Sequence, residues 1–412
     1  MTPSTTSNMA PRMTSHKKSQ ALQSSVTQSV EPIWFDKPLL VTTFALLIIG
    51  FIMISSASVH YAAASEKFAY DPYHFVFRHG VYLVLGMGAA LLTLNIKTEL
   101  WEKASPYLLI SGLVLLILVL FIGQEINGSK RWLNLGFFTV QVSEPVKIFV
   151  VAYLAGYLVR RREELHTQIV GFLRPLLVLS LVTVSLLLEP DFGASVVIVL
   201  TCLAMMFLAG ARLWQFIVLT LTVSGLLSII AETQTYRMNR LKAFLDPWQD
   251  PYDTGYQLIQ SLIAFGRGEI WGQGLGNSIQ KLDYLPMAHT DFVFAVIAEE
   301  TGFVGVVIVL SLFSFLITRI MMVGRRAVEH GKYFAGYMTW GLGITFTLQA
   351  VINIGVTSGA LPTKGLTLPL ISYGGSSLII SCVVIAIILR VDYETRVSRY
   401  KQDGIIPGGV KS

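Results

Sequence analysis

The chain has 412 residues, of which 53% are hydrophobic and only 14% are charged, and its mean hydropathy is +0.62. A soluble protein carries nearer to a quarter charged residues. The apolar residues also cluster in blocks of about 18 to 25, the length that a helix needs to cross a bilayer. The composition therefore excludes an ordinary soluble protein and indicates a polytopic membrane protein.

The N-terminal segment differs from the rest of the chain. About half of residues 1–32 are Ser, Thr and Gln, a composition that cannot bury enough apolar surface to fold. We predict a disordered cytoplasmic tail over residues 1–34, with no secretory signal peptide. A second cytoplasmic tail is predicted over residues 397–412.

Ten apolar blocks predict ten transmembrane helices within a membrane domain over residues 35–396. None shows the alternation of a barrel strand. Because lipid requires each segment to satisfy its own backbone groups, the predicted fold class is all-α. The predicted spans are 39–59, 75–95, 106–123, 144–159, 172–188, 192–210, 213–231, 291–318, 335–357 and 370–390.

The basic residues set the predicted orientation. With the N-terminus inside, most of the 31 Lys and Arg residues fall in the inner loops and tails, as the positive-inside rule requires. Both termini are therefore predicted to be cytoplasmic. The net charge of +6 reflects this topology, so we do not expect nucleic-acid binding.

The longest connection, residues 232–290, is predicted to lie on the outer face between the seventh and eighth spans. A loop of that length in a compact domain is usually functional. It is rich in Trp and Tyr, which settle at the membrane–water interface. Within it, GYQLIQSLIAFGRGE places apolar residues on one helical face, so we expect an amphipathic helix in the interface. The segment MNRLKAF brings Arg240 near lipid headgroups.

Two shorter outer loops also have unusual compositions. The outer loop over residues 124–143 carries most of the stretch GSKRWLNLGFFTVQVSEP (128–145), which is basic at Lys130 and Arg131. TSGALPTKGLTLPLISYGGSS, between the ninth and tenth spans, is dense in Gly, Pro and Ser. Irregular backbone of this kind is tolerated at membrane depth where it is buried in protein or lines a wet cavity.

Ionisable residues in the spans are candidate functional groups, because charge in lipid is costly. Glu144 and Lys147 lie three residues apart on one face of the fourth span. This pair either fixes helix packing or contacts a substrate. In the eighth span, Glu299 lies about 12 Å deeper than Asp291 and is a candidate cavity-lining group. Glu300 points away and is expected to pair with another helix.

The stretch LPMAHTDFVFAVIAEE places Asp291 at the outer mouth of the eighth span, beside His289 and Thr290. An acid at a helix N-terminus can stabilise the helix dipole, so capping and chemistry are alternatives on composition alone. If Asp291 does chemistry, it does so on the outer face, where nucleotides are absent. An activated substrate there must bring its own leaving group, most simply as a lipid-linked sugar.

The other motifs give weaker signals. GQGLGNS imitates a phosphate-cradling loop, but no strand precedes it. The histidines do not occur at metal-ligand spacing, and both cysteines lie inside predicted spans. Gln349 and Asn353, one turn apart in the ninth span, either bond a neighbouring helix or contact a sugar. No cofactor is evident, although a divalent cation could assist.

Three blocks carry a family resemblance: AFGRGEIWGQGLGNSIQKLDYLPMAHTDFVFAVIAEE, GALPTKGLTLPLISYGGSS and GSKRWLNLGFFTVQVSEPVK. The chain resembles the SEDS family (shape, elongation, division and sporulation) over residues 35–400. QKLDYLP and LPTKGLTLP favour the division-septum branch of that family over the elongation branch. Met287 departs from the Glu that is often found at its position, which weakens any claim that an acid is needed there.

The resemblance implies a peptidoglycan glycosyltransferase that polymerises lipid II on the outer face of the bacterial inner membrane, at the division septum. Implied partners are a class B penicillin-binding transpeptidase, other septal division proteins and membrane lipids. The family's essential loop aspartate matches Asp291, expected as the general base, and its fourth-span pair matches Glu144 and Lys147. The other expected substrate contacts are His289, Thr290 and Glu299 and, for the pyrophosphate, Arg131, Lys364 and Arg240.

Two other functions remain open at this stage. A lipid II flippase would transport its substrate across the membrane without forming polymer. A non-catalytic scaffold that recruits the transpeptidase would tolerate loss of Asp291. A general secondary transporter is disfavoured, because the sequence shows no convincing internal repeat.

Overall fold

A computed structural model defines the fold, and one compact unit comprises Phe35–Thr395. The structure describes residues 35–402 except for 65, 67–69, 127–128, 135, 137–138, 222–245, 254 and 363–364. The predicted N-terminal tail and most of the predicted C-terminal tail lie outside the described residues.

The described chain is mostly helical. The helices are α2 (Lys37–Ala64), α3 (His74–Leu94), α4 (Thr98–Ile122), α5 (Ser143–Arg160), α6 (Arg162–Thr167), α7 (Ile169–Leu188), α8 (Phe192–Leu208), α11 (Tyr256–Gly268), α12 (Val293–Glu329), α13 (Tyr333–Thr357) and α14 (Gly375–Gln402). Two short turns, η2 (Pro247–Gln249) and η3 (Gln280–Tyr284), flank α11, and residues 213–221 are also helical.

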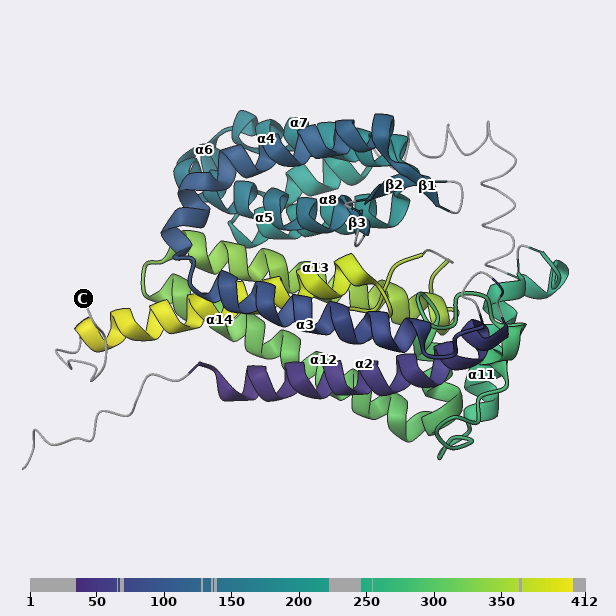
Figure 1. The fold of residues 1–412 in the computed structure, drawn as a ribbon. Coiled ribbons are helices and arrows are strands. Elements are labelled where there is room, and N and C mark those ends of the chain that lie inside the picture. The colour runs from purple at the N-terminus through teal and green to yellow at the C-terminus, as the bar shows by residue number, and fades with distance from the viewer. Residues whose placement is uncertain are drawn as a thin grey trace, which may run out of the picture. The chain divides into compact units, whose positions relative to one another are not determined.

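Three short strands, β1 (Gln124–Ile126), β2 (Ser129–Asn134) and β3 (Thr139–Gln141), lie at the same end of the long helices as α11. This end, at the right of Figure 1, is called the sheet end. The opposite end carries α6 and the turn between α12 and α13. Successive long helices run alternately between the two ends (Figure 1).

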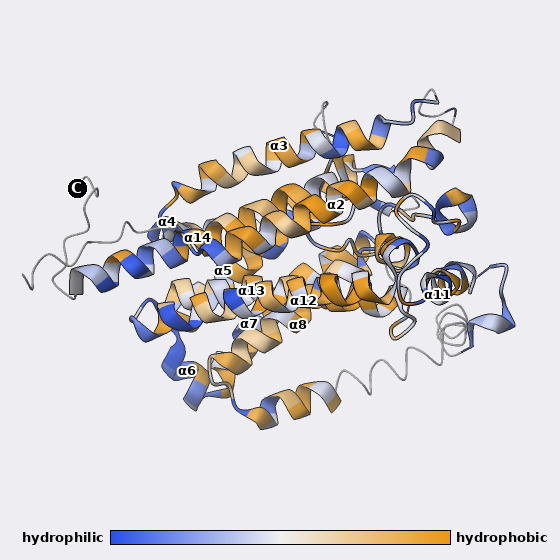
Figure 2. Ribbon diagram, turned by 90° about the horizontal axis from the view of Figure 1, so that it is seen from below, coloured by the Kyte–Doolittle hydropathy of each residue, from blue (hydrophilic) through white to orange (hydrophobic). Residues whose placement is uncertain are grey.

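The helices have the lengths and compositions of membrane spans. Among the described residues, seven are long and apolar enough to cross a membrane, and α8 is a shorter apolar helix. Figure 2 shows apolar residues along the helices and hydrophilic residues gathered toward their ends. The chain is therefore a polytopic helical membrane protein, as predicted. The count of ten spans stays a prediction, because only residues 213–221 of the span 213–231 are described.

The helices form two packed groups. In one group α4 and α8 contact α5 and α7, and in the other α2 contacts α3 and α12 while α12 contacts α13. Helix α13 joins the groups, because it packs against both α5 and α8 (Figure 1). Apolar side chains fill the interior throughout, and α14 is more buried than any other candidate span.

Several predicted spans have different boundaries in the structure. Helix α4 begins at Thr98 rather than at residue 106, and α2 ends at Ala64 rather than at residue 59. Helix α12 continues to Glu329, well beyond the predicted end at residue 318. Helix α14 begins at Gly375 rather than at residue 370. The backbone before α14 cannot be helical, because Leu370 has a φ of 65° and Pro369 removes a backbone donor. Residues 370–374 therefore form part of a loop at the sheet end.

The strands form a small antiparallel sheet of order β1-β2-β3, where the sequence predicted only a loop. Trp132 of β2 pairs with both Gln124 of β1 and Gln141 of β3. Ser376 at the start of α14 covers the outer edge of β3. Its hydroxyl accepts from the Gln141 N–H and donates to the Thr139 carbonyl, both at 3.0 Å. The sheet is thereby attached to the helices around it.

The predicted amphipathic helix is present as α11. Its buried residues include Leu258, Ile259 and Ala264, and α11 packs against α12 and α13. The Ser261 hydroxyl also donates to the Thr357 carbonyl of α13 at 2.6 Å. The apolar face of α11 therefore contacts protein, and the helix is part of the packed unit.

Helix α12 is broken at Gly302. Its φ of 66° and ψ of −165° fall in a region that essentially only glycine adopts. Such a break leaves backbone groups without helical partners, at a depth where each must find one within the protein. Residues 269–274 provide these partners. The bonds are Phe303 N to Glu269 O (2.9 Å), Val304 N to Ile270 O (3.2 Å), Gln273 N to Glu299 O (2.9 Å) and Gly274 N to Glu300 O (3.0 Å).

We predict that Gly302→Ala destabilises the protein by about 2 kcal/mol or more, because it forces a side chain into this backbone region. The added Cβ would also lie 2.3 Å from the Gly272 nitrogen and 2.6 Å from the Ile270 oxygen. The measurement is thermal unfolding of the purified protein in detergent. Gly266→Ala is the matched control, since a Cβ at that position of α11 meets nothing within 4 Å. Equal melting temperatures for the two variants would contradict the prediction.

Candidate active site

Asp291 lies at the sheet end, in the loop before α12 and close to the loop of residues 365–368. It precedes α12, and its side chain is half-buried. The Asn353 side-chain amide of α13 donates to the Asp291 carbonyl at 2.8 Å and to the Leu366 carbonyl at 2.6 Å. A Cβ on Gly365 would lie 2.9 Å from the Asp291 carboxylate, so this glycine lets the 365–368 loop pass close to the acid.

The Asp291 carboxylate does not serve as the cap of α12. The N-cap position is Phe292, and no side chain accepts a hydrogen bond there. Burial raises the pKa of Asp291 to about 6, while the Arg131 guanidinium acts in the opposite direction. A carboxyl group with a pKa near neutrality is suited to accept a proton, because it can both take up and release it at the operating pH.

His289 and Thr290 shape the loop that carries Asp291. The His289 ring is buried, with its centroid 4.6 Å from the Phe75 ring, 5.3 Å from Tyr61 and 5.8 Å from Tyr373. Burial lowers the pKa of His289 to about 4, so the ring is neutral at physiological pH. The Thr290 hydroxyl donates to the Met287 carbonyl at 3.1 Å. In this structure the His289 ring therefore packs against aromatic rings, and the Thr290 hydroxyl is bonded within its own loop.

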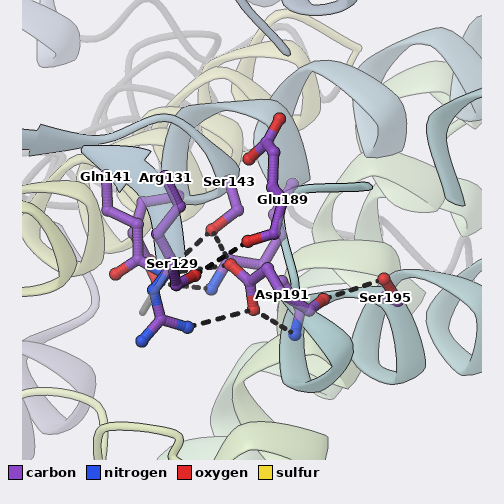
Figure 3. Close-up of polar contacts among 10 residues, drawn as sticks. Ser129, Arg131, Gln141, Ser143, Glu189, Asp191 and Ser195 are labelled. Atoms are coloured by element: carbon purple, nitrogen blue, oxygen red, sulfur yellow. Dashed lines mark hydrogen bonds and ion pairs between the residues drawn. The ribbon is translucent and has the colours of Figure 1, made fainter. Parts of the chain in front are cut away.

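Arg131 belongs to a polar cluster that joins the sheet to α5 and α8 (Figure 3). Its Nη1 lies 3.7 Å from the Asp191 carboxylate. Asp191 is buried in the turn before α8, where it accepts from the Ala194 N–H at 3.2 Å as the N-cap. It also accepts from the Ser143 hydroxyl at 2.8 Å and the Gln141 amide at 3.1 Å. Asp191 therefore binds β2, β3, α5 and α8 together.

Glu189, two residues before Asp191, is an unusual buried acid. It is fully buried, and neither carboxyl oxygen has a hydrogen-bond partner among the described residues. Figure 3 shows its side chain directed away from the Asp191 carboxylate. Burial raises the pKa of Glu189 to about 8; the Asp191 charge adds to the rise and Arg131 opposes it. Glu189 is therefore protonated at neutral pH.

The Glu144–Lys147 pair is closed in this structure. The Lys147 Nζ donates to the Glu144 carboxylate at 2.9 Å, and both side chains are buried. The pair lines a cavity of about 10 Å³ between α5, α13 and α14, together with Gln349 and Ser381. That volume holds about one water. The arrangement fits the packing interpretation of the pair, and a substrate contact would require the cavity to open.

The two adjacent acids of α12 both bind the loop that leads to Asp291. Glu299 is fully buried and accepts from the backbone N–H groups of Ile279 and Gln280, at 3.1 and 3.2 Å, and from the Ser278 hydroxyl. All of these donors belong to one loop segment. Glu299 thus anchors this segment, and its role as a cavity-lining group or substrate contact stays a prediction.

Glu300 pairs with Lys281 at 2.8 Å and accepts from the Ser56 hydroxyl of α2 at 2.6 Å. This is the structural pairing predicted for it. The GQGLGNS stretch also takes part in this anchoring, because its Gln273 and Gly274 N–H groups bond to α12 carbonyls. Those N–H groups are therefore not available to a phosphate.

Some predicted contacts cannot be placed. Lys364 and Arg240 lie outside the described residues. The described residues contain no group of three or more His, Cys, Asp and Glu side chains that could hold a metal ion. Asp191 and Glu189 were not predicted as site residues, although two acids flanking Pro190 at a junction between spans are a visible signal in the sequence. Asn353 was a candidate polar contact, but the bond from its amide to the Asp291 backbone was not predicted.

We predict that Glu189→Gln is more stable than the wild type by a margin that grows as the pH rises. The folded-state pKa of Glu189 is raised from its ordinary value of 4.5 to about 8. The wild type therefore loses stability between those values, by at most about 1.4 kcal/mol per pH unit, while the amide variant does not. Thermal unfolding at pH 5, 6.5 and 8 should show the melting temperature of the wild type falling relative to that of the variant.

Glu125→Gln, an exposed acid on β1, is the control for this measurement. Its curve should follow the wild type across the series. A constant difference between the wild type and Glu189→Gln at all three pH values would show that Glu189 does not hold its proton over this range.

Comparison with known proteins places the chain in a family. The family model described as "Cell cycle protein", which covers FtsW, RodA and SpoVE, matches residues 37–397. A relative named "Probable peptidoglycan glycosyltransferase FtsW" from Coxiella burnetii is 50% identical over 363 residues, covering 88% of this chain and 97% of the relative. A relative of the same name from Escherichia coli O6:H1 is 48% identical over 368 residues, covering 89% and 88%.

Solved structures agree with these matches. A chain from a structure titled "Structural coordination of polymerization and crosslinking by a peptidoglycan synthase complex" matches with a TM-score of 0.72 and 29% identity, covering 88% of this chain and 98% of that chain. The crystal structure of the rod shape determining protein RodA from Thermus thermophilus matches with a TM-score of 0.64 and 28% identity, covering 87% and 96%. The predicted resemblance is confirmed: the chain belongs to the cell cycle protein family of FtsW, RodA and SpoVE.

Proposed function

We propose that this chain is a peptidoglycan glycosyltransferase that polymerises lipid II into glycan strands, with Asp291 as its general base. The observation that carries the proposal is the setting of Asp291. Its carboxyl group is half-buried beside the 365–368 loop, its pKa is raised to about 6, and the Arg131 guanidinium acts on it. The name shared by the FtsW relatives supports the same activity.

In the proposed reaction, Asp291 accepts the proton from the 4-hydroxyl of the acceptor's N-acetylglucosamine. The oxygen then forms a bond to the anomeric carbon of the lipid-linked donor, with inversion from α to β. The bond from that carbon to the diphosphate breaks, and undecaprenyl pyrophosphate leaves with the electron pair. A positioned base contributes about 10² to 10⁴ to the rate.

The leaving diphosphate needs cationic stabilisation. Arg131 fits this role, because a guanidinium matches the planar geometry of phosphate oxygens and remains charged. Its side chain is 24% exposed, so one side of the group is accessible. Lys364 and Arg240 are further proposed contacts, and a divalent cation could add charge. No nucleotide is required, since the donor carries its own leaving group.

The proposed reaction takes place on the outer face of the bacterial inner membrane, at the division septum, with both termini cytoplasmic. The sheet end would then face outward, which places Asp291 and Arg131 on the side where lipid-linked sugars accumulate. A class B penicillin-binding transpeptidase and other septal proteins are the proposed partners. The similarity to a chain from a peptidoglycan synthase complex supports such an assembly.

We predict that Asp291→Asn lowers glycan polymerisation by the purified protein about 10²- to 10⁴-fold, because an amide cannot accept the proton. The assay supplies lipid II and the transpeptidase partner and separates the glycan strands on a gel. Asp253→Asn, the same change at an exposed residue of the same outer segment, should retain full activity.

Three outcomes distinguish the possible functions. Full strand synthesis by Asp291→Asn would remove Asp291 as the base. Transport of labelled lipid II across vesicles without polymer from the wild type would favour a flippase. Unimpaired division in cells that carry only Asp291→Asn would favour a scaffold.

We also predict an acid limb in the pH–rate profile of the wild type with a midpoint near pH 6. Asp291 must be ionised to act as a base, so activity should fall as the pH drops through the pKa of about 6. The residual activity of Asp291→Asn should lack this limb. Initial rates between pH 4.5 and 8 provide the measurement, and a wild-type profile that is flat from pH 5 to 7 would contradict it.

A further inference from the structure

We propose that Asp191 is a positioning residue that holds the Arg131 guanidinium beside Asp291. The inference rests on the proposed function, since it assigns a residue to the same site. The geometry points to Asp191 because its carboxylate lies 3.7 Å from Arg131 and is itself fixed from several directions. Asp191 would not touch the substrate. It would act through the position of Arg131.

The Asp191 carboxylate is satisfied without Arg131. One oxygen accepts from the Ser143 hydroxyl and the Gln141 amide, and the other accepts from the Ala194 N–H at the start of α8. The positive end of the α8 dipole further stabilises its charge. A buried anion held in this way is a rigid electrostatic anchor, because its own hydrogen bonds do not depend on the residue that it attracts.

Arg131 is the less constrained member of the pair. Its single ion pair is longer than a hydrogen bond, and its Nε has no hydrogen-bond partner among the described residues. A guanidinium has five N–H donors, and the Arg131 side chain is 24% exposed, so part of the group can reach a ligand. Two other hydrogen bonds hold the strand itself: the Val142 N–H donates to the Arg131 carbonyl at 3.3 Å, and the Ser129 hydroxyl donates to the Glu189 carbonyl at 2.8 Å.

Among the described residues, Asp191 forms an ion pair with Arg131, and the Arg131 charge also acts on Glu189 and Asp291. Glu189 is protonated at neutral pH and does not compete for the guanidinium. Arg131 therefore has one fixed anion, Asp191, as its ion-pair partner, and its charge also acts on the proposed base. Without the attraction of Asp191, its long flexible side chain would extend toward solvent and away from Asp291.

A purely structural role is the rival explanation, because Asp191 is also the N-cap of α8. The two roles predict different couplings. If Asp191 positions Arg131, substituting Asp191 has no further effect on the reaction once Arg131 has been removed. If Asp191 is only a cap, substituting it reduces activity whether or not Arg131 is present. A double-mutant cycle separates them, because residues that act as a unit are non-additive.

The experiment compares Asp191→Asn, Arg131→Gln and the double variant in polymerisation of lipid II, measuring kcat/KM and the acid limb of the pH–rate profile. We expect Arg131→Gln to lower kcat/KM roughly 100-fold and to move the acid limb above pH 6, because Arg131 lowers the pKa of Asp291. Asp191→Asn should lower kcat/KM and move the limb in the same direction. The double variant should be no less active than Arg131→Gln.

Ser195→Ala is the matched control. Its hydroxyl donates at 2.9 Å to the backbone carbonyl of Asp191 rather than to the carboxylate, so activity and acid limb should stay at wild-type values. Ser143→Ala, which removes one anchor of the carboxylate, should give a smaller shift in the direction of Asp191→Asn. This variant tests the proposal even where Asp191→Asn fails to fold.

The proposal is overturned if Asp191→Asn lowers kcat/KM by the same factor in the wild-type and Arg131→Gln backgrounds. It is also overturned if neither Asp191→Asn nor Ser143→Ala moves the acid limb. A wild-type protein that forms no glycan would instead overturn the proposed function. A wild type that polymerises lipid II, together with an Asp191→Asn variant that behaves like Ser195→Ala, would overturn this inference alone.

Discussion

The break in α12 at Gly302 is the constraint on which the sheet end depends. At membrane depth, the backbone groups that the break exposes need partners within the protein, and residues 269–274 supply them. The loop before Asp291 is therefore bonded to the interior of α12. An α12 without the break would bond to itself and leave those residues without partners. The position of Asp291 at the start of this helix depends on the same arrangement.

The adjacent acids of α12 extend this anchoring through their side chains. Glu299 binds the backbone of residues 278–280, while Glu300 binds Lys281 and Ser56. Burying two carboxylates without partners would be costly, and donors from one loop segment and from α2 offset this cost. The three acids of LPMAHTDFVFAVIAEE consequently divide their roles. Two fix the loop, and Asp291 is left half-buried with a raised pKa.

The sequence allowed prediction of those parts of the fold that depend on local hydrophobicity. Spans such as α3 and α13 appear within a few residues of their predicted bounds, because length and apolarity alone define them. The strands were not predictable in this way, since β1 and β3 have three residues each and gain stability from neighbours such as Ser376. The hydrogen bonds that Glu299 accepts from residues 278–280 were not predictable for a related reason. Helical periodicity gives the direction of a side chain but not the loop that meets it.

Residues of the candidate site were predictable from the sequence only where a charged residue stands at an unusual position along the chain. Asp291 stood out because an acid at the mouth of an apolar helix is unusual, and Arg131 because it follows Lys130 in an outer loop. Asp191 gave a weaker signal, because an acid at a helix start is also an ordinary cap. Its contacts come from Arg131, Gln141 and Ser143, which lie 48 to 60 positions earlier in the chain. No local pattern records such a convergence.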